Sequence, residues 1–173
     1  LEFNLDCNSI IALDIGASTG GFTDVLLANG ASKIYAVDVG YGQLDWKLRQ
    51  DERVIVKEKT NARFLTDQII KDPLDAVVCD ASFISLKKVL LSGLRLLKSY
   101  GWLVALIKPQ FEVGKGLVGK GGVVRDPKLH KLVINDITKW IEYEIKMNVL
   151  GVIESPILGP KGNREFLLVA TKI

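Results

Sequence analysis

The end of the chain constrains the possible folds most. Two strand-like segments, Asn148 to Ser155 and Arg164 to Lys172, are separated only by the short turn Pro156 to Asn163. A parallel pair needs a crossover connection of a dozen residues or more, so these two strands are expected to be antiparallel. Upstream, short apolar runs alternate with helical patterns, which is typical of an α/β domain with a mostly parallel sheet. The earlier strands are expected at residues 10–15, 33–39, 54–57, 74–80 and 102–108.

Three helices are expected between and after these strands, at residues 19–29, 85–98 and 127–147. In the second of them Leu86, Leu90 and Leu94 recur at helical steps. Pro127 suits the first turn of the third, and His130 within it is expected to be exposed among lysines. The sequence therefore predicts a seven-stranded α/β sheet, mostly parallel, ending in an antiparallel hairpin.

Composition fits one domain. The chain has 173 residues, 48% of them hydrophobic and 25% charged, with a formal net charge of +3. Its apolar runs are far shorter than the roughly 20 residues of a membrane helix, and a secretory signal pattern is lacking. Cys7 and Cys79 do not have a metal-ligand spacing, so we expect no metal site and a reduced cytoplasmic protein.

A glycine-containing loop follows the first strand, in the segment Leu13 to Phe22. Ligands of parallel α/β sheets lie outside the carboxyl ends of the strands, so this loop is placed to hold one. We expect Gly16 and Gly20 to let the backbone approach that ligand closely. The dinucleotide pattern G-x-G-x-x-G fails because Ser18 stands at its second glycine, which disfavours a nicotinamide cofactor.

Asp38 ends the second strand, where a carboxylate can accept both hydroxyls of an adenosine ribose. The same geometry serves nicotinamide and other adenosine cofactors, so Asp38 alone does not choose between them.

Several segments, in order, resemble a known family. Residues 14–22 resemble the first motif of the FtsJ-like RNA ribose methyltransferases, and further segments narrow the resemblance to the TlyA-type (hemolysin A) subgroup. These are residues 38–44, 60–63, 80–86, 107–112 and 159–166. The resemblance covers essentially the whole chain. It implies a Rossmann-like S-adenosylmethionine-dependent methyltransferase fold and 2′-O-methylation of ribosomal RNA.

The resemblance also implies a site. Its cofactor contacts fall on Gly20, Phe22, Asp38, Asn61 and Asp80, and the neighbouring Gly16, Ala17, Ser18 and Val39 are expected to complete the S-adenosylmethionine site. Asp80, Lys108 and Glu165 match three members of the family's Lys-Asp-Lys-Glu tetrad. The first lysine and the family's N-terminal S4 RNA-binding domain have no counterpart in residues 1–173, so we expect a domain of a longer protein, weakly active or inactive alone.

Residue chemistry agrees with a catalytic role for this group. Asp80, Lys108 and Glu165 lie at or near strand ends that should be neighbours in the sheet. A ribose hydroxyl is a poor nucleophile, and a lysine can accept its proton or stabilise the developing oxyanion. Alternatively, Lys108 is an ordinary strand-end lysine and Glu165 a solvated residue.

The segment Gly114 to Gly122 lacks the ending of a phosphate-binding P-loop, and its glycines and lysines predict a flexible loop that faces RNA. Basic residues continue through Arg125, Lys128 and Lys131. Two other functions remain open: a nicotinamide-dependent oxidoreductase, and a membrane-lysing protein as the hemolysin label suggests.

Overall fold

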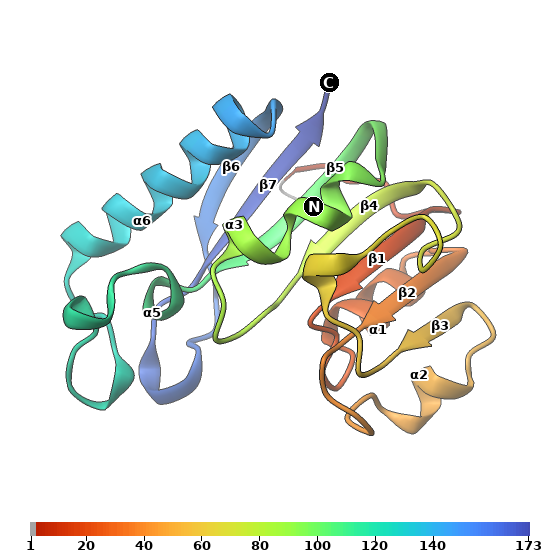
Figure 1. Cartoon of the computed structure of the whole chain (residues 1–173), viewed down its shortest axis with the longest axis horizontal. Coiled ribbons are helices and arrows are strands. Elements are labelled where there is room, and N and C mark those ends of the chain that lie inside the picture. The colour runs from red at the N-terminus through yellow and green to blue at the C-terminus, as the bar shows by residue number, and fades with distance from the viewer. Residues whose placement is uncertain (1–2) are drawn as a thin grey trace.

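The computed structural model describes residues 3–173, which form one seven-stranded sheet with helices on both faces (Figure 1). The strands lie in the order β3-β2-β1-β4-β5-β7-β6. Their bounds are β1 Ile11–Ile15, β2 Lys33–Val37, β3 Val54–Lys57, β4 Leu74–Cys79, β5 Leu97–Ile107, β6 Met147–Glu154 and β7 Phe166–Lys172. β1 to β5 are parallel, and β7 pairs antiparallel with both β5 and β6. The predicted antiparallel hairpin is confirmed.

The helices are α1 Gly21–Ala28, α2 Trp46–Gln50, α3 Leu86–Val89, α4 Leu91–Arg95, α5 Pro109–Glu112 and α6 Pro127–Lys139. One core cluster packs α3, α4 and α6 against one face of the sheet, and a second packs α1 and α2 against the other. The short helices α2 and α5 have no counterpart among the predicted elements. Asp45 caps α2 by accepting a hydrogen bond from the backbone N–H of Lys47.

The helix predicted over residues 85–98 is too long. It divides into α3 and α4, and Leu97 already pairs with Leu74 of β4. The chain then bulges before Trp102 pairs with Ala76. Gly101 permits the bulge, because a Cβ there would lie 2.7 Å from the Leu97 side chain. The burial of Leu97 as the first residue of β5 thus outweighs the helical pattern.

The helix predicted over residues 127–147 is also too long. α6 ends at Lys139, and Trp140–Glu144 form a π-helical turn in which the Ile145 N–H donates to the Trp140 carbonyl at 3.1 Å. Such a turn places the successive residues Trp140 and Ile141 in the core. Lys146, with a φ of 63°, then ends the helix before β6.

The topology gathers the predicted catalytic residues at one edge of the sheet. β4, β5 and β7 are neighbours, and β7 begins where β4 and β5 end. Asp80 and Lys108 directly follow β4 and β5, and Glu165 directly precedes β7. The expectation that their elements are neighbours is confirmed.

Candidate active site and cofactor pocket

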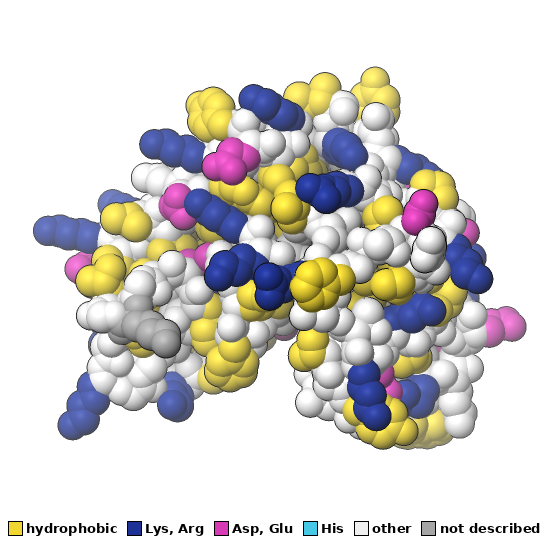
Figure 2. All heavy atoms as spheres, viewed as in Figure 1, with side chains coloured by type: hydrophobic (Ala, Val, Ile, Leu, Met, Phe, Trp, Pro, Cys, Tyr) yellow, Lys and Arg dark blue, Asp and Glu magenta, His cyan; other side chains and the backbone are white. Residues whose placement is uncertain are grey.

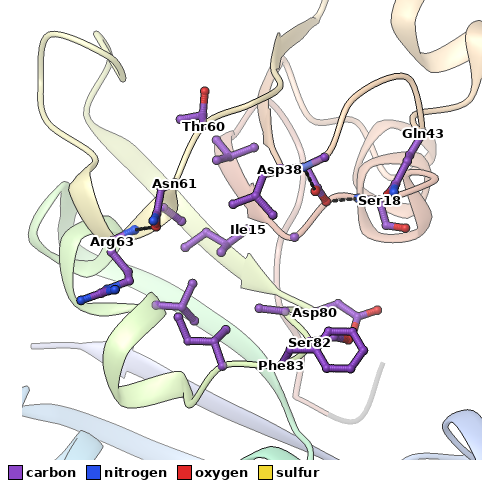
Figure 3. Close-up of a pocket in the computed structure, with 18 residues that line it drawn as sticks. Ile15, Ser18, Asp38, Gln43, Thr60, Asn61, Arg63, Asp80, Ser82 and Phe83 are labelled. Carbon is purple, nitrogen blue, oxygen red and sulfur yellow. Dashed lines mark hydrogen bonds between the residues drawn. The ribbon is translucent and has the colours of Figure 1, made fainter.

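A pocket of about 520 Å³ opens at the carboxyl ends of β1, β2 and β4, within the range usual for small-molecule sites. Figure 3 shows the side chains that line it. Six of the residues predicted to bind the cofactor are among them: Gly16, Ser18, Asp38, Val39, Asn61 and Asp80. Ala17, Gly20 and Phe22 are not among the lining residues.

Asp38 joins the end of β2 to the glycine loop (Figure 3). Its Oδ2 accepts from the Ser18 N–H at 2.8 Å, and its Oδ1 accepts from the Gly40 N–H at 2.7 Å. A carboxylate oxygen can accept two hydrogen bonds, so each still has an acceptor position. These two free acceptor positions fit a pair of ribose hydroxyl donors.

The glycines of the loop face protein. A Cβ at Gly16 would lie 2.9 Å from the Asp80 carbonyl oxygen, and one at Gly20 would lie 2.9 Å from Leu44 Cδ1. Both glycines also have positive φ values, 76° and 105°. Positive φ and close packing of the loop against the chain after β4 and against α2 both require these glycines, and the ligand approach expected from the sequence stays a prediction.

Asp14 lies beneath the loop, and sequence reasoning gave it no role. It is 1% exposed, and its Oδ2 accepts a hydrogen bond from Thr23 Oγ1 at 2.7 Å. Its Oδ1 is buried and has no hydrogen-bond partner within residues 3–173. Burial raises the pKa of Asp14 to about 7 despite the Thr23 bond, and the negative charges of Asp80 and Asp38 add to the effect.

Lys108 forms an ion pair with Asp80, which lines the pocket. Lys108 Nζ lies 2.6 Å from Asp80 Oδ1 and donates to Ser82 Oγ at 2.9 Å. The lysine side chain is 9% exposed and the aspartate side chain 46%. An ammonium has three N–H donors, so these two partners leave one available. Lys108 is therefore a buried, held cation and not a solvated strand-end lysine.

Glu165 is also buried, at 6% exposed, which excludes the interpretation as a solvated residue. Its Oε1 accepts from Gln110 Nε2 at 3.0 Å. A Cβ at Gly159 would lie 2.5 Å from the Glu165 carboxyl carbon, so the carboxylate lies directly against that glycine. Within residues 3–173 no hydrogen bond or ion pair joins Glu165 to Lys108; Gln110, two residues after the lysine, is the link.

α5 supports the loop that carries Asp80. Glu112 accepts from the Ser85 hydroxyl at 2.7 Å and from the Leu86 N–H at 2.8 Å, which holds the start of α3. Phe111 packs against Phe83, whose ring is 89% exposed and lines the pocket. Ser82 and Phe83 lie within the matched segment 80–86, but the sequence alone assigns them no role. No periodic or charge signal singles them out.

The part of the chain that the structure describes has neither a membrane-spanning helix nor a metal-binding cluster of the usual side chains. No helix within residues 3–173 is long and apolar enough to cross a membrane. The same residues bring together no group of three or more His, Cys, Asp or Glu side chains that could hold a metal ion.

The chain matches one protein family and is similar to several known proteins. Residues 2–172 match the family described as FtsJ-like methyltransferase. The chain is 51% identical over 156 residues to the 16S/23S rRNA (cytidine-2′-O)-methyltransferase TlyA of Mycobacterium tuberculosis, covering 90% of this chain and 58% of that protein. It is 46% identical over 169 residues to Hemolysin A of Brachyspira hyodysenteriae, covering 96% and 70%.

A solved structure from Lactococcus lactis superimposes with a TM-score of 0.95 at 45% identity, covering 99% of this chain and 82% of that one. The chain spans just under three fifths of the length of the first of these curated relatives. The match over nearly all residues, with the seven-stranded sheet and its antiparallel end, places the chain in the FtsJ-like methyltransferase family.

Proposed function

We propose that this chain transfers a methyl group from S-adenosylmethionine to a ribose 2′-hydroxyl of ribosomal RNA, in the cytoplasm. The observation that carries the proposal is the Lys108–Asp80 ion pair, buried on the lysine side and open to the pocket on the aspartate side. The activity for which the TlyA relative of Mycobacterium tuberculosis is named supports the same reaction. The family match favours this function over a nicotinamide-dependent oxidoreductase.

Cofactor binding is assigned to residues of β1, β2 and the segments after β3 and β4. Asp38 has acceptor positions for ribose hydroxyls, as described above. Asn61 uses its Oδ1 to cap the turn at Arg63, which leaves its amide group to donate. Asp80 offers a carboxylate to a positively charged amino group. When bound, S-adenosylmethionine supplies an electrophilic methyl group, so the protein mainly aligns donor and acceptor.

Lys108 is assigned to the ribose oxygen. Asp80 and Ser82 fix its ammonium group, and the remaining N–H can hold the 2′-oxygen and stabilise the negative charge that develops there as the hydroxyl proton passes to water. Glu165 is positioned by Gln110 to orient the acceptor ribose or the lysine. The segment 114–122 is proposed to face the RNA backbone.

The test is methyl transfer from tritiated S-adenosylmethionine to purified ribosomal subunits, with the modified position located by primer extension. Label on a ribose is expected. Label on a base would contradict the proposed chemistry. Calorimetry with S-adenosylmethionine and with NAD separates the two cofactors before any RNA is added.

A further inference from the structure

Two loops that are far apart in the sequence meet beside Glu165. One is the basic loop, residues 114–125, and the other is the turn at residues 156–163 between β6 and β7. Figure 1 shows them side by side at the lower left, below α5. Neither segment contains an acidic residue. The side chain of Lys115, in the first loop, lies outside the part of the chain that the structure describes.

Asn163 ties the two loops together. Its side chain is buried, at 3% exposed, and both ends of its amide are used. Oδ1 accepts from the Val124 N–H at 3.0 Å, and Nδ2 donates to the Gly122 carbonyl at 3.0 Å and to the Pro160 carbonyl at 3.2 Å. One amide therefore closes the turn and holds the end of the basic loop against it.

His130 binds the backbone carbonyl of Val124, the residue whose N–H Asn163 binds. Its Nε2 lies 2.8 Å from the Val124 carbonyl oxygen, which can only accept, so Nε2 carries the proton. The ring packs against Phe166, and His130 is 6% exposed, so the expectation that it is exposed is wrong. His130 lies on the buried face of α6, together with Val133 and Ile137. From there it donates a hydrogen bond to the Val124 carbonyl. This end of the loop is thereby anchored to α6 and to β7.

The turn that Asn163 closes also forms the wall behind Glu165. The Gly159 N–H donates to the backbone carbonyl of Asn163 at 2.8 Å. The Gly159 Cα faces the Glu165 carboxyl group. The position of that carboxylate therefore depends on the turn, and the turn depends on Asn163.

The joined loops present positive charge. Lys120, Arg125 and Lys161 are exposed, and within residues 3–173 none of them has an acidic partner. We call these three residues the basic rim. A Cβ at Gly122 would lie 3.9 Å from Lys161 Nζ, so the lysine of one loop lies over the backbone of the other. Figure 2 shows the surface hollowed between this lobe and the lobe that carries α2.

We infer that Asn163 is a positioning residue that couples the basic rim, as a contact surface for the RNA phosphate backbone, to the carboxylate of Glu165. The inference rests on the proposed function for its RNA partner. Phosphate contacts fix register without reading sequence, so a rim held rigidly to Glu165 would set the ribose relative to the catalytic group. Asn163 is not among the residues that line the cofactor pocket, and within residues 3–173 no hydrogen bond joins it to Lys108.

The experiment uses the purified chain and a fluorescein-labelled RNA hairpin. We expect Asn163→Ala to weaken hairpin binding at least about fivefold by anisotropy and to lower the salt dependence, since fewer phosphates are contacted. Lys120→Ala and Lys161→Ala should each reduce the slope of log affinity against log salt by roughly one. Affinity for S-adenosylmethionine should stay unchanged. Asn135→Ala, at an exposed position on α6, is the matched control.

A second measurement reports on Glu165 without RNA. The side-chain amide signals of Gln110 in a ¹H–¹⁵N spectrum should move in Asn163→Ala, although within residues 3–173 no hydrogen bond joins Gln110 to Asn163. Asn163→Asp keeps the acceptor for Val124 and loses the two donated bonds, so it should show intermediate shifts and remain testable if the alanine variant does not fold.

The two ideas can fail separately. Unchanged hairpin affinity and unchanged Gln110 signals in a folded Asn163 variant would overturn the coupling while the proposed function stands. A wild-type chain that binds neither S-adenosylmethionine nor RNA would overturn the proposed function and, with it, the RNA contact assigned to the basic rim.

Discussion

Lys108 and Asp80 meet at 2.6 Å across the boundary between the protein interior and the pocket. The two residues leave adjacent parallel strands, β4 and β5, at the same edge of the sheet. The lysine is enclosed and the aspartate is half exposed, so the pair can hold a cation at a fixed place beside a bound molecule. Removing Asp80 is expected to cost more than breaking a surface ion pair would, because the buried charge of Lys108 would remain without its acidic partner.

Replacing Lys108 should separate catalysis from cofactor binding. Lys108→Ala is expected to lower the rate of methyl transfer by about 10²- to 10⁴-fold, the usual contribution of one acid–base or charge-stabilising group. Affinity for S-adenosylmethionine, measured by calorimetry, should change little, because Lys108 does not line the pocket. Lys98→Ala, which removes an exposed ion pair with Asp75, is the control. Full activity in Lys108→Ala would refute the role of the lysine.

Asp38 should control cofactor affinity. Asp38→Ala removes the proposed ribose acceptors and also leaves the Ser18 and Gly40 N–H groups without their partner. Hydrogen bonds to charged groups contribute about 1.5–3 kcal/mol, so affinity should fall at least about tenfold. Isothermal calorimetry provides the measurement, with exposed Asp24→Ala as the control. Equal affinity in the Asp38 variant would count against the assigned contact.

Methyl transfer should require a glycine at position 159, because the Glu165 carboxylate lies directly against it. Its φ of −73° is open to any residue, so the effect of Gly159→Ala is steric. The added methyl group would displace the Glu165 carboxylate. We expect methyl transfer to fall strongly while cofactor affinity is kept. Gly114→Ala adds a methyl group where nothing lies within 4 Å, and it should behave as wild type. Equal rates for both variants would show that the carboxylate tolerates displacement.

Asp14 should make stability fall as pH rises from about 4 to about 7. The unfolded chain releases this proton near the unperturbed pKa of about 3.9, whereas the folded protein keeps it until its pKa of about 7. The unfolded state therefore binds fewer protons in this window, and the free energy of unfolding decreases with pH. The total effect is of the order of a few kcal/mol.

Asp14→Asn removes that titration, so the variant should lose less stability than wild type between pH 4 and pH 8. Urea unfolding midpoints across this range provide the measurement, and exposed Asp24→Asn is the control. Identical pH profiles for wild type and Asp14→Asn would mean that the buried carboxyl does not titrate in this window.

The strands were predictable because their signals are local. Apolar runs, together with the short turn before β7, are enough to define the parallel strands and the antiparallel end of the sheet. The sequence also places Asp38, Asp80, Lys108 and Glu165 at strand ends on one edge. Helix ends were less predictable: Leu97 joins the sheet although it continues a helical pattern, because its burial is set by a partner far away in the chain.

The remaining features of the site depend on contacts between distant residues. Asn163 and His130 converge on Val124 from two elements, and no spacing in the sequence indicates that they meet. The same is true of Gln110 and Glu165. Asp14 carries a perturbed pKa only because the fold encloses it, and an isolated acid at a strand end gives no sign of that.

The strand order also bears on synthesis at the ribosome. The cofactor pocket is formed by residues 15–89, whereas Glu165 arrives only with β7, which inserts between β5 and β6 after all other strands have been made. A nascent chain that has emerged through α3 already contains every residue that lines the pocket. Its catalytic edge stays open until the hairpin of β6 and β7 pairs, so Glu165 joins Asp80 and Lys108 only after β7 has been made.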